Sequence, residues 1–199
     1  AGHPKEYAHI AWGDINTQFY GYIRGYKEAA DTIIQQALKK GDNSTLDTYV
    51  FPACYLYRQY LELALKDIYL TNSKDSRQDK IATIKSCGHK LVDIWKKVKP
   101  LILADFPNDD ESVLDAVEDY IKQFAKVDAD SFAFRYPITK DLELINNQGK
   151  FINLVNLTER MSELECFLSA VSMGMSVNRD FENEMLSYYA EDISDYYYY

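Results

Sequence analysis

Apolar residues recur along this chain at intervals of three and four positions, the spacing that places them on one face of an α-helix. Residues 17–39 carry the first such stripe, which stops at Gly41 in a Gly-Asp-Asn-Ser turn sequence. A second, more apolar stripe covers residues 52–70, with Pro52 in the first helical turn, where its missing N–H costs nothing. Both stretches are predicted to be helices.

The same period returns in the middle of the chain. A helix over residues 88–103 is expected to kink or end near Pro100, because proline cannot donate the backbone hydrogen bond. The next helix is expected to begin near Asn108, with Glu111 three positions later in a capping-box spacing and Val113 on its inner face.

Towards the C-terminus, a long helix is predicted over residues 152–177 and a shorter acidic helix over residues 181–189. Three other stretches lack a convincing helical pattern. They are a separate turn at 46–50, a solvent-exposed loop at 71–80, and a long irregular loop at 127–150 with a small hairpin turning at Asn146 and Asn147. A loop of this last length is uncommon in a compact domain and is often functional.

These elements predict an all-α fold, a helical bundle of five to six helices with one long irregular loop. The 199 residues fit one domain over 1–190, followed by an acidic, tyrosine-rich tail over 191–199. No apolar run approaches the roughly 18–20 residues of a membrane-spanning helix, and no secretory leader is visible. We therefore expect a cytoplasmic protein without membrane contact.

Cys54, Cys87 and Cys166 are odd in number and far apart, which indicates reduced thiols and not a disulfide framework. No cysteine pair has the spacing of a zinc site, so we expect no metal and no cofactor. Glycine-rich phosphate loops, a nucleophile elbow, an HExxH helix and an EF-hand loop are absent from the sequence.

The net charge is −9, from 31 acidic and 22 basic residues. Attraction of nucleic acid to the whole surface is not expected, because phosphate binding depends on clustered lysine and arginine. A local basic groove is still compatible with this charge, so RNA or a nucleotide stays a possible ligand.

The first candidate for chemistry is a polar stripe on the second helix, formed by Arg58, Glu62 and Lys66 at four-residue spacing. One interpretation is a solvent-facing strip with a Glu62–Lys66 ion pair. The other is that Arg58 and Glu62 point inward, where the arginine requires a carboxylate or an anionic ligand.

The second candidate is His89, with Asp93 one turn later on the same predicted helix face. A histidine next to an aspartate can be held in one tautomer and act as a base or a phosphate contact. The alternative is a capping or surface histidine.

The third candidate lies within residues 130–137 of the long loop, where Phe132, Phe134 and Tyr136 surround Arg135. The guanidinium can bind phosphate or carboxylate in bidentate fashion. Alternatively, the aromatic residues fasten the loop to the helices while Arg135 bridges to a carboxylate.

Residues 51–66, 88–95 and 131–137 together resemble a pattern of bacterial HEPN-like proteins. The resemblance implies a four- or five-helix bundle, often dimeric, in prokaryotic toxin–antitoxin and antiviral defence systems. It also implies a metal-independent ribonuclease with an arginine and a histidine four to six residues apart.

No arginine of this chain is followed by histidine at that spacing. A ribonuclease site would have to be assembled in space from Arg58, His89 and Arg135, with Glu62, Lys66, Asp93 and Tyr136 as binding residues. The resemblance leaves two functions open. The favoured one is a non-enzymatic module that forms a homodimer or binds a partner protein, and the alternative is an RNA-cleaving or nucleotide-sensing effector.

The tail over 191–199 combines acidic residues with tyrosines. It can be a disordered end, an element that docks into a basic partner, or a substrate for tyrosine modification. The acidic protein can also mimic nucleic acid and block a basic site.

Overall fold

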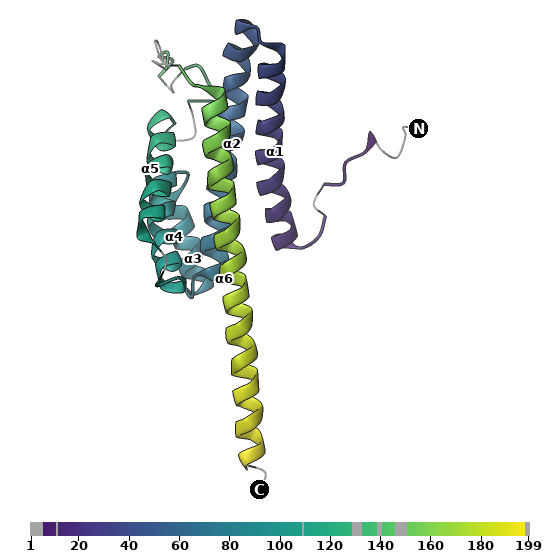
Figure 1. The fold of residues 1–199 in the computed structure, drawn as a ribbon, viewed down its shortest axis with the longest axis vertical. Coiled ribbons are helices and arrows are strands. Elements are labelled where there is room, and N and C mark those ends of the chain that lie inside the picture. The colour runs from purple at the N-terminus through teal and green to yellow at the C-terminus, as the bar shows by residue number, and fades with distance from the viewer. Residues whose placement is uncertain are drawn as a thin grey trace.

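The computed structural model describes residues 6–10, 12–108, 110–128, 133–138, 141–145 and 151–197, with the backbone alone for 190–197. The described chain forms six helices around one core, which confirms the all-α prediction (Figure 1). In chain order they are α1 (Ile15–Lys40), α2 (Asn43–Asn72), α3 (Arg77–Cys87), α4 (Leu91–Asp105), α5 (Glu111–Val127) and α6 (Leu154–Tyr197). None of the described helices combines the length and the apolar character needed to cross a membrane.

α1 and α2 form a tight antiparallel hairpin. Gly41 takes the left-handed backbone conformation (φ 69°) that ends α1, and Asp42 caps α2 by accepting a hydrogen bond from the Thr45 backbone N–H at 2.8 Å. α2 therefore begins well before Pro52. The expected separate turn at 46–50 was wrong, and Pro52 lies inside the helix on an exposed surface.

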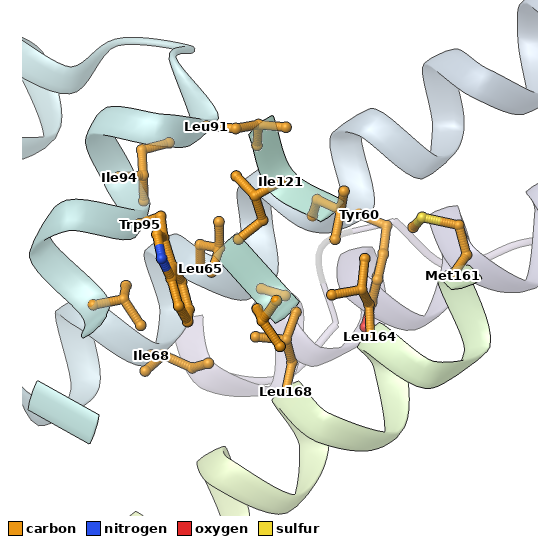
Figure 2. Close-up of a cluster of buried hydrophobic side chains, with 14 of the residues drawn as sticks. Tyr60, Leu65, Ile68, Leu91, Ile94, Trp95, Ile121, Met161, Leu164 and Leu168 are labelled. Atoms are coloured by element: carbon orange, nitrogen blue, oxygen red, sulfur yellow. The ribbon is translucent and has the colours of Figure 1, made fainter. Parts of the chain in front are cut away.

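α2 is the central element of the bundle and packs against α1, α4 and α6. Its apolar side chains meet those of its neighbours in one continuous core, and α4 contributes the fully buried Trp95 (Figure 2). The residues labelled in that view are Tyr60, Leu65, Ile68, Leu91, Ile94, Trp95, Ile121, Met161, Leu164 and Leu168.

The loop expected at 71–80 is correct only over residues 73–76, because α2 continues to Asn72 and α3 begins at Arg77. Ser76 caps this helix by accepting from the Asp79 backbone N–H at 3.2 Å, and its hydroxyl donates to the Asp79 carboxylate at 2.6 Å. α3 has almost no apolar face, so the apolar period could not reveal it.

α4 continues through Pro100 to Asp105, so of the two alternatives expected there, a kink or an end, the helix end is wrong. Pro100 is exposed, while Ile102 beyond it is buried and helps hold the last turn on the core. In α5 the cap is Asp110, which accepts from the Ser112 backbone N–H at 2.9 Å, and not Asn108. Val113, expected inside, is 47% exposed.

The long irregular loop between α5 and α6 is confirmed over its described residues. An isolated antiparallel bridge joins Ile138 to Leu144, so the chain reverses direction before residue 145. The turn predicted at Asn146 and Asn147 lies outside the described residues. α6 is one helix of 44 residues, not a helix over 152–177 followed by a second one, and its backbone stays helical through most of the expected tail.

A core substitution tests this packing. We expect Leu65→Ala to lower the free energy of unfolding by about 2–5 kcal/mol, because the fully buried side chain leaves a cavity when shortened. The measurement is urea unfolding followed by circular dichroism. Leu38→Ala, at a position that is 42% exposed, serves as the control and should cost clearly less. Equal losses in the two variants would contradict the packing.

Candidate functional site

Arg58 and Glu62 point into the protein, not toward solvent. Arg58 is completely buried and Glu62 is 4% exposed. One turn of α2 separates them, and Arg58 Nη1 lies 3.1 Å from Glu62 Oε2. The other Glu62 oxygen, Oε1, accepts a hydrogen bond from Lys66 Nζ at 2.6 Å. The inward interpretation therefore holds, and the arginine has its carboxylate within the same helix.

His89 joins this group from the connection between α3 and α4. Its backbone carbonyl accepts a hydrogen bond from Arg58 Nη2, and its ring Nδ1 lies 2.9 Å from Glu62 Oε1. The imidazole itself is 65% exposed. Arg58, Glu62, Lys66 and His89 thus form one cluster, which we call the Arg58 network, that ties α2 to the start of α4.

Charge and burial oppose each other in the Arg58 network. Burial alone would raise the pKa of Glu62, but the hydrogen bonds from Lys66 and His89 and the charge of Arg58 outweigh it, so the pKa is lowered. Burial lowers the pKa of Arg58, against the opposing charges of Glu62 and Asp128. The guanidinium nevertheless stays protonated, because arginine starts from a very high pKa. Arg58 and Glu62 therefore form a buried ion pair.

His89 and Asp93 do not pair as the sequence predicted. His89 precedes α4, which begins at Leu91, so the two residues do not share a helix face. Asp93 forms an ion pair with Lys96 at 3.0 Å. The carboxylate that holds His89 comes from another helix, which spacing along one segment could not indicate.

The long loop brings Arg135 close to the Arg58 network. Its guanidinium carbon lies 5.9 Å from the ring centres of both Tyr55 and Tyr136, and Tyr55 is one turn before Arg58 on α2. Arg135 and Tyr136 are exposed. Because Tyr55 lies one turn before Arg58, Arg135 is held at the part of α2 that carries the Arg58 network.

Two buried residues, Phe134 and Asp128, hold the described part of the long loop on the bundle. Phe134 is buried, and its ring centre lies 6.3 Å from that of Phe124 on α5. Asp128 is 1% exposed and accepts a hydrogen bond from the Ala133 backbone N–H at 2.9 Å. Among the aromatic residues expected to fasten the loop, Phe134 does so, while Tyr136 stays outside. Phe132 lies outside the described residues.

A second buried polar network, centred on Lys27, was not predicted from the sequence. Lys27 of α1 is 2% exposed and forms ion pairs with Asp31 at 2.9 Å and with Glu165 of α6 at 2.8 Å. The Tyr57 hydroxyl donates to Asp31 at 2.6 Å. Burial alone would lower the pKa of Lys27, but its bonds to Glu165 and Asp31 raise it. A signal was present, because Lys27 shares the face of α1 that buries Ala30 and Ile34.

The chemistry open to the Arg58 network is narrow. Glu62 can hold the N–H of His89 Nδ1, which leaves Nε2 as the acceptor on the exposed ring. However, Arg58 is engaged by Glu62 and by the His89 carbonyl, so it has no direct path to a phosphate. Four surface hollows of the described residues are lined by none of Arg58, His89 and Arg135. No group of three or more potential metal ligands occurs in the described part of the chain.

Comparisons with known proteins found no matching family model, no similar curated protein and no similar solved structure. A functional assignment therefore depends on the geometry of this chain and on its sequence pattern.

The buried ion pair can be tested against a surface pair of the same spacing. We expect Glu62→Gln to lower the free energy of unfolding by about 3–5 kcal/mol at neutral pH, because Arg58 is left buried without its counter-ion. The control is Glu28→Gln, which breaks the exposed Arg24–Glu28 pair and should have far less effect. Urea unfolding measures both, and similar losses would mean that the Arg58 network does not stabilise the fold.

The lowered pKa of Glu62 predicts that the stability difference between wild type and Glu62→Gln depends on pH. The folded pKa of Glu62 lies below its ordinary value of 4.5, so its stabilisation is fully present above about pH 4.5. This contribution is lost as the pH falls through the folded pKa. The stability difference between wild type and Glu62→Gln should therefore shrink in acid, as measured by urea unfolding at several pH values. A difference that grew on acidification would contradict the lowered pKa.

Proposed function

We propose that this chain is a HEPN-like, non-enzymatic binding module of a prokaryotic defence or toxin–antitoxin type system, acting through contact with another protein chain. The observation that carries the proposal is the internal engagement of Arg58 by Glu62 and the His89 carbonyl. A catalytic arginine has to meet charge that develops on the substrate. Here the guanidinium is buried and already neutralised, which supports a structural role.

The binding role is supported by the surface of α6. Apolar and aromatic side chains stay exposed along α6 from Met173 onward, although a contiguous apolar surface is normally covered in a monomeric protein. They include Met173, Val177, Phe181, Leu186, Tyr188 and Tyr189, each more than half exposed. The biological setting rests on the resemblance of residues 51–66, 88–95 and 131–137 to the HEPN-like pattern.

One observation favours the alternative, a metal-independent RNA-cleaving or nucleotide-sensing effector. Glu62 orients His89 while leaving most of the imidazole exposed, and Arg135 lies in the same neighbourhood. A base next to a cation is the minimum that cleavage of RNA at a 2′-hydroxyl requires. A test for RNA cleavage therefore has to include both His89 and Arg135.

The test is incubation of the purified chain with single-stranded and structured RNA in EDTA. We expect the RNA to stay intact, because no arginine of the Arg58 network is open to phosphate. His89→Ala and Arg135→Ala should behave as wild type, and a metal-independent ribonuclease provides the positive control. Cleavage by the wild type that is lost in both variants would overturn the non-enzymatic assignment and establish the effector.

A further inference from the structure

The last part of α6 extends beyond the helical bundle. Near the end of the bundle, Arg179 contacts α2 by a hydrogen bond from Nη1 to the Asn72 side-chain oxygen at 3.0 Å. Every residue over 180–189 is exposed. The stretch 180–197, which we call the acidic extension, adds about 27 Å of helix at ~1.5 Å per residue, and Figure 1 shows it running away from the other five helices.

Most helical stability in proteins comes from packing, and the acidic extension packs on no other element over residues 180–189, where every residue is exposed. The acidic extension presents Phe181, Met185, Leu186, Tyr188 and Tyr189, none of which is buried. Such a surface is typical of a helix that is covered by a partner.

The charge of the extension indicates what that partner carries. Residues 180–199 contain six acidic residues and no lysine or arginine. Among the described residues, Asp180, Glu182 and Glu184 form no ion pair. Two acidic extensions packed only on each other would repel, so the complementary surface has to be basic.

The same chain holds a basic surface of this kind. Residues 74–99 contain eight lysines and arginines against three aspartates, a net charge of +5 in a protein of net charge −9. On α3, Arg77, Ile81 and Lys85 follow one another at four-residue spacing and are all exposed, with Ile81 at 46%. Within the described part of the chain, Arg77 and Lys85 have no acidic partner. This α3 face offers an apolar side chain between two cations.

The two surfaces lie at the same end of the bundle but cannot meet within one chain. Arg179 is fixed to the end of α2, only a few residues before α3 begins, and the extension continues away from that point (Figure 1). In two copies related by a two-fold axis, each extension can lie along the α3 face of the other. Such an arrangement is closed, because both copies use both surfaces.

The exposed aromatic area of the two extensions is comparable in magnitude with the area that a stable interface buries. Aromatic side chains bury roughly 150–250 Å² each when fully covered, and stable interfaces bury about 1,600 Å² in total. Phe181, Tyr188 and Tyr189 are more than half exposed in each copy, so the two extensions supply a substantial share of that area.

We infer that the chain forms a homodimer by reciprocal docking, in which the acidic extension of each copy binds the Arg77–Ile81–Lys85 face of the other. This inference rests on the proposed function, since it names a second copy of the chain as the protein that the module binds.

The test is a charge exchange between two full-length variants, followed by sedimentation velocity at protein concentrations up to about 100 µM. One variant carries Asp180→Lys and Glu184→Lys, and the other carries Arg77→Glu and Lys85→Glu. Each variant alone should dimerise at least about tenfold more weakly than wild type, because like charges face each other. An equal mixture of the two should recover a heterodimer, since both of its interfaces are then complementary: the reversed charges face each other at one, and the wild-type charges face each other at the other.

The matched control for the α3 variant is Lys39→Glu with Lys126→Glu, which lowers the net charge by the same four units at exposed positions away from both surfaces. It should dimerise as wild type does, and circular dichroism should show all three variants folded. A monomeric wild type, or a mixture that recovers no heterodimer, would overturn the reciprocal docking. Neither outcome affects the RNA assay, which alone decides whether the chain is an enzyme.

Discussion

Twelve of the thirty residues of α2 are buried, and two of these twelve, Arg58 and Glu62, are ionised. A helix packed on three sides cannot turn such residues to solvent, so the charge has to be balanced inside the protein. The bond from Arg58 to the His89 carbonyl also fixes the polypeptide between α3 and α4. Arg58 thus links the buried charge of α2 to the segment that leads into α4, the helix that carries the buried Trp95.

The same requirement explains why the candidate residues assemble and yet do not form an open site. Lys66 and His89 contact one oxygen of Glu62 and Arg58 contacts the other, so both oxygens have partners inside the protein. Arg135 comes from the long loop and is exposed, with its guanidinium over the ring of Tyr55. Arg58 and Lys66 therefore gather around one buried carboxylate, and this arrangement does not by itself indicate catalysis.

A second polar network, formed by Lys27, Asp31, Tyr57 and Glu165, joins α1, α2 and α6. With the core, it holds the first half of α6 firmly on the bundle. The acidic extension is exposed throughout residues 180–189, and its charge contrasts with the basic α3 and α4 region at the same end. Charge is thus distributed unevenly along the chain, and the acidic charge of the exposed helix favours binding to a basic surface.

The sequence by itself determined the all-α class, the position of most helices, and the inward pair Arg58 and Glu62 as one of two alternatives, because apolar periodicity reports burial directly. It could not reveal α3, because this helix is capped by Ser76 but has almost no apolar face. It also could not reveal that α4 continues through Pro100, where the burial of Ile102 outweighs the loss of one backbone hydrogen bond. Only the tertiary structure decided that His89 pairs with Glu62 and not with Asp93. Those partners lie 27 residues apart, and such contacts depend on how helices pack, which local spacing does not encode.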